Sequence, residues 1–202
     1  KHCWYGYPKQ HVTTDIWWYY MIELGFYWSL IFSLVIDNKR KDFVEMIVHH
    51  VATILLMTLS WANNMVRVGT LVLAVHDAVD YWMEGAKMTK YMKYHRLCDA
   101  LFVVFTIVWF ITRICIYPLR IIRSTAFEAD TIIVFFPMYY IYNALLCILQ
   151  VLHFIWFYMI CCLVYEFVTT GKVEKDERSE TEPEATDEDE EVKNVEGKNQ
   201  VK

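Results

Sequence analysis

Two histidines and two aspartates stand on consecutive apolar segments of the chain. His49 and His50 lie in FVEMIVHHVATILL, and Asp77 and Asp80 lie in RVGTLVLAVHDAVDYWMEGAK. Ionisable side chains inside membrane-length helices are costly, so they usually mark a functional site. An imidazole held by a carboxylate can act as a general base or as a nucleophile. The pattern therefore predicts general-base or nucleophilic chemistry at these four residues.

The spacing of these residues predicts that they meet. The turn between the two segments is short, so the two helices run antiparallel. His49 lies about seven residues inside the charged start of its helix, and Asp80 lies equally far from the charged end of the next, roughly 10 Å in each case. Asp77 and Asp80 are three residues apart and share a side of their helix, which Glu84 extends. We expect the histidines and aspartates at one level, near one membrane face.

A metal site is the first alternative. Five residues could serve as ligands, as in membrane di-iron hydroxylases and desaturases: His49, His50, His76, Asp77 and Asp80. Those enzymes need several HxxHH-type clusters, and this chain has one HH pair, so we predict no metal and no cofactor. His76 and His153 are expected to be packed or hydrogen-bonded core residues.

The composition predicts an all-α polytopic membrane bundle. The 202 residues are 56% hydrophobic and 17% aromatic, with 6 Gly and 4 Pro, which is too apolar for an ordinary soluble domain. The six cysteines show no metal-binding spacing. Nothing in the composition indicates nucleic-acid binding. The first residue is Lys1, so we expect the chain to be part of a longer protein.

Hydropathy divides the chain into three parts. Residues 1–15 are expected to form a luminal aromatic segment, and residues 169–202 a disordered, acidic cytosolic tail. Between them, residues 16–168 form the membrane domain. About five spans are predicted there, at residues 16–36, 43–61, 65–83, 97–117 and 139–168. The partly apolar segment 118–130 is predicted to be a loop on the membrane face or folded back onto the bundle.

Basic clusters predict the orientation. Clusters at residues 39–41, 87–96 and 172–178 fall on one side of a five-span bundle, which the positive-inside rule makes cytosolic. The histidine and aspartate residues then open toward the cytosol. Basic side chains at that mouth could attract a phosphate-bearing donor such as an acyl-CoA; they are Lys39, Arg40, Lys41, Lys90 and Lys93.

The histidine and aspartate motifs carry a specific resemblance. KRKDFVEMIVHHVATILL followed by RVGTLVLAVHDAVDYWMEGAK resembles the signature of the ceramide synthases, within the TRAM-LAG1-CLN8 (TLC) membrane domain. CWYGYP, FYWSL, YHRLCDALFVVF and LQVLHFIWFYMI are also similar to that family. The resemblance covers nearly the whole chain.

The resemblance implies an endoplasmic-reticulum acyltransferase. It would N-acylate sphinganine or sphingosine with a fatty acyl-CoA as co-substrate, inside helices that surround a lipid tunnel. His49 would take the acyl group or act as base, with Asp80 or Asp77 orienting it and His50 assisting proton transfer. Ping-pong transfer and direct attack both stay open. The family also implies possible homo- or hetero-dimers with related synthases.

Two further expectations concern specificity and regulation. The family implies that the segment before the last span biases acyl-chain length: Phe136, Pro137, Met138, Tyr139, Tyr140, Ile141, Tyr142 and Asn143. An aromatic membrane anchor is the alternative reading of that segment. In the acidic tail, Ser179, Thr181 and Thr186 each have an acidic residue at position +3, as acidophilic kinases favour. A merely solvating tail is the alternative there.

A non-enzymatic role is the main rival. Other members of the wider family serve in lipid sensing, trafficking or translocation, and buried histidine and aspartate pairs can simply hold helices together. Under that hypothesis, isosteric Asp→Asn and His→Gln changes leave function intact.

Overall fold

The computed structural model describes residues 3–36, 42–129 and 138–170. Three groups of predicted functional residues therefore lie outside the described residues, and their roles stay predictions. These are Lys39, Arg40 and Lys41 of the basic mouth, Phe136 and Pro137 of the selectivity segment, and Ser179, Thr181 and Thr186 of the tail.

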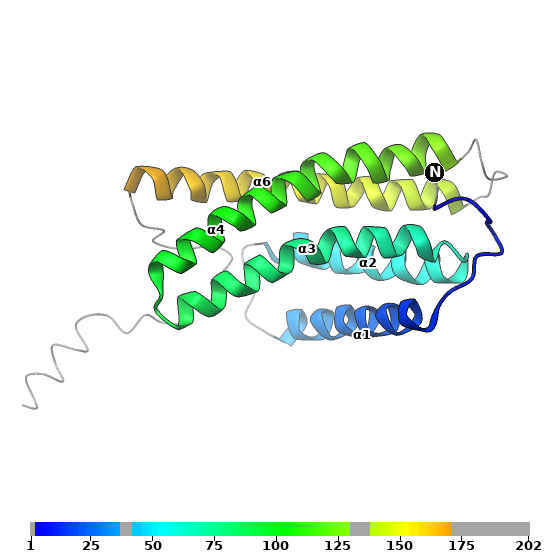
Figure 1. The fold of residues 1–202 in the computed structure, drawn as a ribbon, viewed down its shortest axis with the longest axis horizontal. Helices are drawn as coiled ribbons and strands as arrows, with labels where there is room; N and C mark the ends of the chain where they lie inside the picture. Colours follow the sequence, from blue (N-terminus) through cyan, green and yellow to red (C-terminus); the bar gives the residue numbers. More distant parts are fainter. Residues whose placement is uncertain (1–2, 37–41, 130–137, 171–202) are drawn as a thin grey trace, which may run out of the picture.

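The described residues are helical and contain no strand (Figure 1). In chain order the elements are α1 (Thr14–Ile36), α2 (Phe43–Ala62), α3 (Val66–Tyr91), α4 (His95–Trp109), η1 (Phe110–Ile122), η2 (Ser124–Glu128) and α6 (Met138–Thr170). Figure 1 shows α2 and α3 in the middle of the bundle, α1 on one side of them, and the α4 rod with α6 on the other.

Four helical segments are long and apolar enough to cross a membrane: Thr14–Ile36, Phe43–Ala62, His95–Glu128 and Met138–Thr169. α3 does not meet that criterion, because it carries the ionisable side chains. It is joined to α2 and α4 by short turns and packs against both. That it crosses the membrane as a fifth span stays a prediction. Large apolar side chains such as Ile22, Phe26 and Phe32 point outward, as expected of a lipid-facing surface. The expected helical membrane bundle is confirmed, and the protein is multi-pass.

The predicted loop at residues 118–130 is wrong, because the helix continues from His95 to Glu128. Residues recurring at every fourth position are buried there: Trp109, Arg113, Tyr117, Ile121, Thr125 and Ala129. On an α-helix, positions four apart advance about 40° beyond a full turn, so five such steps would carry the buried face to the far side. The wider turns of a π-helix, which forms η1 and η2, keep this face on the bundle.

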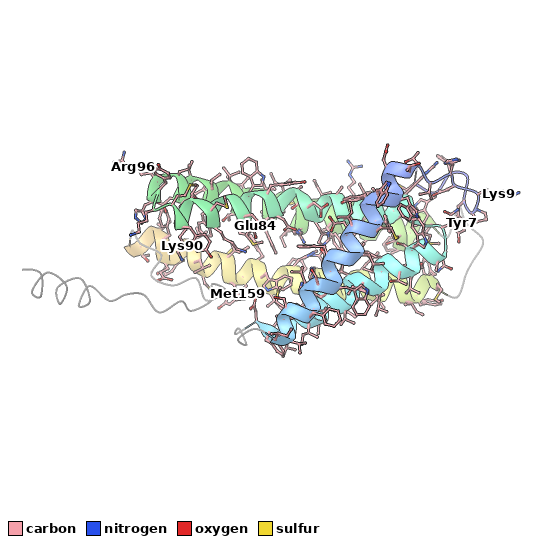
Figure 2. The ribbon with its side chains drawn as sticks, turned by 90° about the horizontal axis from the view of Figure 1, so that it is seen from below. Tyr7, Lys9, Glu84, Lys90, Arg96 and Met159 are labelled. Carbon is pink, nitrogen blue, oxygen red and sulfur yellow. The ribbon has the colours of Figure 1, made fainter. Side chains whose placement is uncertain are left out.

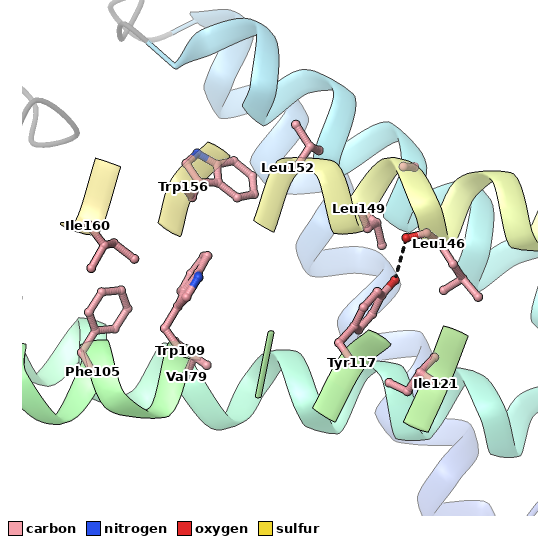
Figure 3. Close-up of a cluster of buried hydrophobic side chains, with 11 residues drawn as sticks. Val79, Phe105, Trp109, Tyr117, Ile121, Leu146, Leu149, Leu152, Trp156 and Ile160 are labelled. Carbon is pink, nitrogen blue, oxygen red and sulfur yellow. Dashed lines mark hydrogen bonds between the residues drawn. The ribbon is translucent and has the colours of Figure 1, made fainter. Parts of the chain in front are cut away.

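The main hydrophobic cluster joins the α4–η1 rod to α6 (Figure 3). Phe105 and Trp109 of α4 pack against Trp156 and Ile160 of α6. Further along the rod, the hydroxyl of Tyr117 donates to the carbonyl oxygen of Leu146 at 3.3 Å. This packing holds η1 in place, and η1 carries a residue of the site described below.

A second cluster attaches α1 to α2 and α3. Tyr20 is 1% exposed, and its hydroxyl lies 3.2 Å from Ser60 Oγ and 3.2 Å from the carbonyl oxygen of Val66. A Cβ added at Gly69 would overlap the hydroxyl of Tyr20, so the glycine permits this close approach. Seating α1 in this way places its inner face against the polar residues of α2 and α3.

Candidate active site

His49 lies in an aromatic cage at the centre of the bundle. Its ring centroid is 5.3 Å from the ring of Trp156 on α6, 6.2 Å from His76 on α3 and 6.3 Å from Tyr27 on α1. Its Nδ1 is buried and has no hydrogen-bond partner among the described residues. The imidazole is therefore held by ring packing while one nitrogen keeps its bonding capacity.

His50 lies beside His49 and is 3% exposed. Its ring is 5.8 Å from Tyr27, and its buried Nδ1 also lacks a hydrogen-bond partner within the described part of the chain. The contact of His49 with His76, the residue before Asp77, confirms that the paired histidines and the aspartate helix meet at one level.

The two aspartates have partners other than these histidines. Asp77 accepts a hydrogen bond from the hydroxyl of Tyr19 on α1. Asp80 lies 3.8 Å from the guanidinium of Arg113 on η1, and its side chain is 51% exposed. The expected orienting of His49 by Asp77 or Asp80 therefore has no direct hydrogen bond in this structure. The carboxylate of Asp77 is instead held by α1, and that of Asp80 lies near the guanidinium on η1.

Arg113 is a residue of the site that the sequence analysis did not single out. Its side chain is 5% exposed and stacks on Trp109, with the guanidinium carbon 4.9 Å from the ring centroid. Its NH2 group donates to the carbonyl oxygen of His76 at 2.9 Å, and its NH1 group lies 3.3 Å from His153 Nε2. The rule that singles out ionisable residues in apolar helices applies equally to this arginine.

His76 and His153 form a buried pair next to this arginine. Their Nε2 atoms are 3.1 Å apart, and His76 Nδ1 lies 2.7 Å from the carbonyl oxygen of Val72. A carbonyl oxygen can only accept, so His76 Nδ1 carries the hydrogen in that contact. His153 is 0% exposed. Both are hydrogen-bonded core residues, as the sequence predicted.

The described residues contain no group of three or more His, Cys, Asp or Glu side chains placed to hold a metal ion. His76 is engaged with Val72 and His153, and Asp77 with Tyr19. Three of the five residues of the metal-site alternative, His76, Asp77 and Asp80, thus have separate partners.

A narrow apolar cavity of about 60 Å³ begins beside the cage. At this end it is lined by Tyr27, Thr53 and His76, all of which contact His49. At its other end it is lined by Trp4, which precedes α1, and by residues at or near helix termini: Met65, Ala129 and Tyr142. We call that end of the bundle the distal end. Met65 and His76, which line the two ends, are separated by a rise of about 16 Å along the helix.

The described part of the predicted selectivity segment borders the distal end. Tyr139, Tyr142 and Asn143 line the cavity, whereas Tyr140 and Ile141 point outward and are exposed. Met138 packs with the cluster at the same end. The hydroxyl of Tyr142 accepts a hydrogen bond from Asn63 at the α2–α3 turn, which fixes this wall. Three of the six described residues are thus placed to touch a molecule in the cavity.

Lys90 and Lys93 lie at the opposite end of the bundle, at the α3–α4 turn, and both are exposed. Figure 2 shows Lys90 and Arg96 together at this basic end, and Tyr7 and Lys9 at the distal end. From Asp80 to Lys90 the helix rises about 15 Å. The site therefore lies between a basic end and a cavity that leads away from it.

Comparison with known proteins identifies the fold family. The profile described as TLC domain, TRAM_LAG1_CLN8, matches residues 1–162. The chain belongs to the TLC-domain family. This TLC-domain chain is 47% identical to ceramide synthase 5 of Homo sapiens over 189 residues, 94% of the chain and 48% of that protein. It is 44% identical to ceramide synthase 4 of Bos taurus over 180 residues, 89% of the chain and 46% of that protein.

A relative of lower identity is also named as a ceramide synthase. The TLC-domain chain is 40% identical to ceramide synthase hyl-1 of Caenorhabditis elegans over 195 residues, 90% of the chain and 52% of that protein. The resemblance to ceramide synthases expected from the motifs is confirmed. The chain spans about half the length of the curated relatives that it matches.

Proposed function

We propose that the protein is a ceramide synthase, an acyltransferase that joins a fatty acyl group from acyl-CoA to the amine of sphinganine or sphingosine. The observation that carries the proposal is the narrow apolar cavity that starts at the His49 cage and runs to the distal end. Such a cavity suits one extended aliphatic chain whose reactive end lies beside an imidazole. The names of the relatives support the same reaction.

In the proposed reaction His49 acts on the thioester carbonyl. In the ping-pong form, a ring nitrogen attacks that carbon, the carbon–sulfur bond breaks, and coenzyme A leaves as a thiolate that takes up a proton. The neutral amine then attacks the acyl-imidazole, the new amide bond forms, the amine proton is given up and His49 is released. In the direct form, His49 removes the amine proton during attack on the thioester, the carbon–sulfur bond breaks, and coenzyme A leaves and takes up that proton. The buried Nδ1 of His49, which has no partner in the described part of the chain, suits both forms.

The neighbouring polar groups have proposed supporting roles. His50 assists proton transfer, and its Nδ1 is likewise without a partner among the described residues. Asp77 and Asp80, fixed by Tyr19 and Arg113, attract the ammonium form of the acceptor. Lys90 and Lys93 draw the phosphates of coenzyme A to the basic end, together with Lys39, Arg40 and Lys41.

The proposed orientation puts the basic end in the cytosol, in the membrane of the endoplasmic reticulum. The acidic tail then shares that side. Phosphorylation of Ser179, Thr181 and Thr186 would place negative charge near the basic mouth and compete for it. Membrane lipids would surround the apolar outer faces. A homo- or hetero-dimer with a related synthase stays part of the proposal.

The test uses the full-length protein in cells that lack endogenous ceramide synthases. Their membranes receive sphinganine and a panel of acyl-CoAs, and dihydroceramides are measured by mass spectrometry for wild type and His49→Ala. Product from wild type alone supports the acyltransferase and the role of His49. Product from neither protein, with both folded in the membrane, favours the non-enzymatic relatives instead.

A further inference from the structure

A tryptophan from the N-terminal segment lines the distal end of the cavity. Trp4 is 4% exposed and lines the cavity. It packs in one cluster with Met65, Ala129 and Tyr142, which border the cavity at the same end. Residues 3–10 precede α1 and are not part of any helix. Because this segment is not helical, Trp4 is buried through its contacts with the helices of the bundle.

The indole of Trp4 is held by a hydrogen bond to the helical rod. Its Nε1 donates to Ser124 Oγ at 3.0 Å, and Ser124 Oγ lies 3.0 Å from Glu128 Oε2. The ring is therefore fixed both by packing and by a directed polar contact. A molecule that extended past the distal end would have to break this bond as well as displace the ring.

The segment that carries Trp4 is fastened over the α2–α3 turn. Asn64 Nδ2 donates to the carbonyl oxygen of Gln10 at 3.2 Å and also to that of Pro8. Arg67 donates to the carbonyl oxygen of Tyr5 at 3.3 Å. These contacts come from the turn at which the cavity ends. The position of Trp4 is thus set by the same part of the bundle that forms the end of the cavity.

We propose that Trp4 is the end wall of the acyl cavity and limits the length of the fatty acyl chain that the protein accepts. The inference rests on the proposed function. A chain held with its carbonyl at His49 fills the cavity toward Trp4. Each methylene beyond that length has no apolar space inside the bundle and loses its packing.

Trp4 belongs to the segment before α1, whereas the described residues of the predicted selectivity segment belong to α6. Tyr142 borders the distal end together with Trp4, and Tyr139 and Asn143 line the same cavity from α6. Under the proposal, a smaller residue at position 4 lengthens the space along the acyl chain from outside the predicted selectivity segment.

The experiment measures the chain-length profile of four variants of the full-length protein with an equimolar acyl-CoA panel. Trp4→Ala and Trp4→Phe shorten the end wall, and Ala129→Leu fills the same end. Trp18→Ala, a tryptophan on the outer face of α1 that is 57% exposed, is the matched control. Membrane abundance and thermal unfolding are recorded for each variant.

We expect Trp4→Ala to raise the ratio of longer to shorter products, by about tenfold for two additional methylenes. Trp4→Phe shifts the profile in the same direction by less, Ala129→Leu shifts it toward shorter chains, and Trp18→Ala leaves it unchanged. If Trp4→Ala does not fold, Trp4→Phe and Ala129→Leu still decide the matter. An unchanged profile in the folded Trp4 variants overturns the inference while the wild-type product upholds the acyltransferase. Absence of product from wild type overturns the proposed function itself.

Discussion

The rings of His49 and His76 lie against each other across the α2–α3 interface, with centroids 6.2 Å apart and planes inclined by 30°. The two histidines are neighbours with different bonding. His76 uses both ring nitrogens, toward Val72 and His153, whereas His49 Nδ1 has no partner among the described residues. The two side chains should therefore respond differently to the same substitution.

We expect His49→Gln to lower dihydroceramide formation at least about 100-fold, the range for loss of a general acid–base group. The stability of this variant should change little, because His49 Nδ1 makes no hydrogen bond to any residue that the structure describes. His76→Gln should instead destabilise the protein by about 1–3 kcal/mol, since buried partners lose their bonds. Product analysis and thermal unfolding in detergent measure the two effects, with the exposed His95→Gln as control. Near-wild-type activity of folded His49→Gln would contradict the assignment.

Arg113 should act through His76 and His153 more than through Asp80. Its ion pair with Asp80 is long, at 3.8 Å, and Asp80 is 51% exposed, so their coupling should stay below about 1 kcal/mol. Its contacts with His153 and the carbonyl of His76 are buried. Arg113→Met should therefore destabilise by about 2–4 kcal/mol, and Arg113→Lys should restore little because an ammonium lacks the guanidinium fork.

Double-mutant cycles separate the two contacts of Arg113. The cycle with Asp80→Asn should give a smaller coupling energy than the cycle with His153→Phe, both taken from thermal unfolding. The reverse order would mean that the exposed ion pair dominates, and the description of Arg113 as part of a buried chain would fail.

Tyr19→Phe removes the hydroxyl that donates to Asp77. Because the acceptor is a carboxylate, we expect a loss of about 1.5–3 kcal/mol in stability. Dihydroceramide formation should fall as well, since Asp77 would no longer be held in position. Tyr81→Phe, at an exposed tyrosine on α3, the helix that carries Asp77, is the matched control. Equal behaviour of both variants would show that the hydroxyl of Tyr19 has no such role.

Gly69→Ala tests the seating of α1. The added Cβ would overlap the hydroxyl of Tyr20 and lie 2.9 Å from Ser60 Oγ, so we expect a loss of about 1–3 kcal/mol. Gly25→Ala meets no atom within 4 Å and should stabilise α1 by about 0.5–1 kcal/mol. Tyr20→Phe should partly rescue Gly69→Ala. If both alanine variants unfold at the same temperature, the close approach at Gly69 is not required.

Much of the architecture follows from local properties of the sequence. The apolar runs and their lengths predict the membrane bundle, because each helix satisfies its own backbone hydrogen bonds. The turn after α2 is short, so α2 and α3 run antiparallel and are aligned from that turn. This alignment predicts that His49 meets α3 at one level. The loop at residues 118–130 could not be excluded in this way, because its helical continuation depends on packing of Tyr117 and Ile121 against α6.

The amino-acid sequence by itself determined the helical class and the candidate residues His49, His50, Asp77 and Asp80, since these depend on residue type and spacing along one chain. Tertiary structure alone decided their partners. Tyr19 reaches Asp77, and Arg113 reaches Asp80 and His153, across 33 to 58 residues of sequence. Trp4 meets Ser124 across 120 residues. Such contacts depend on how the helices pack against one another, which the spacing of residues along the sequence does not predict.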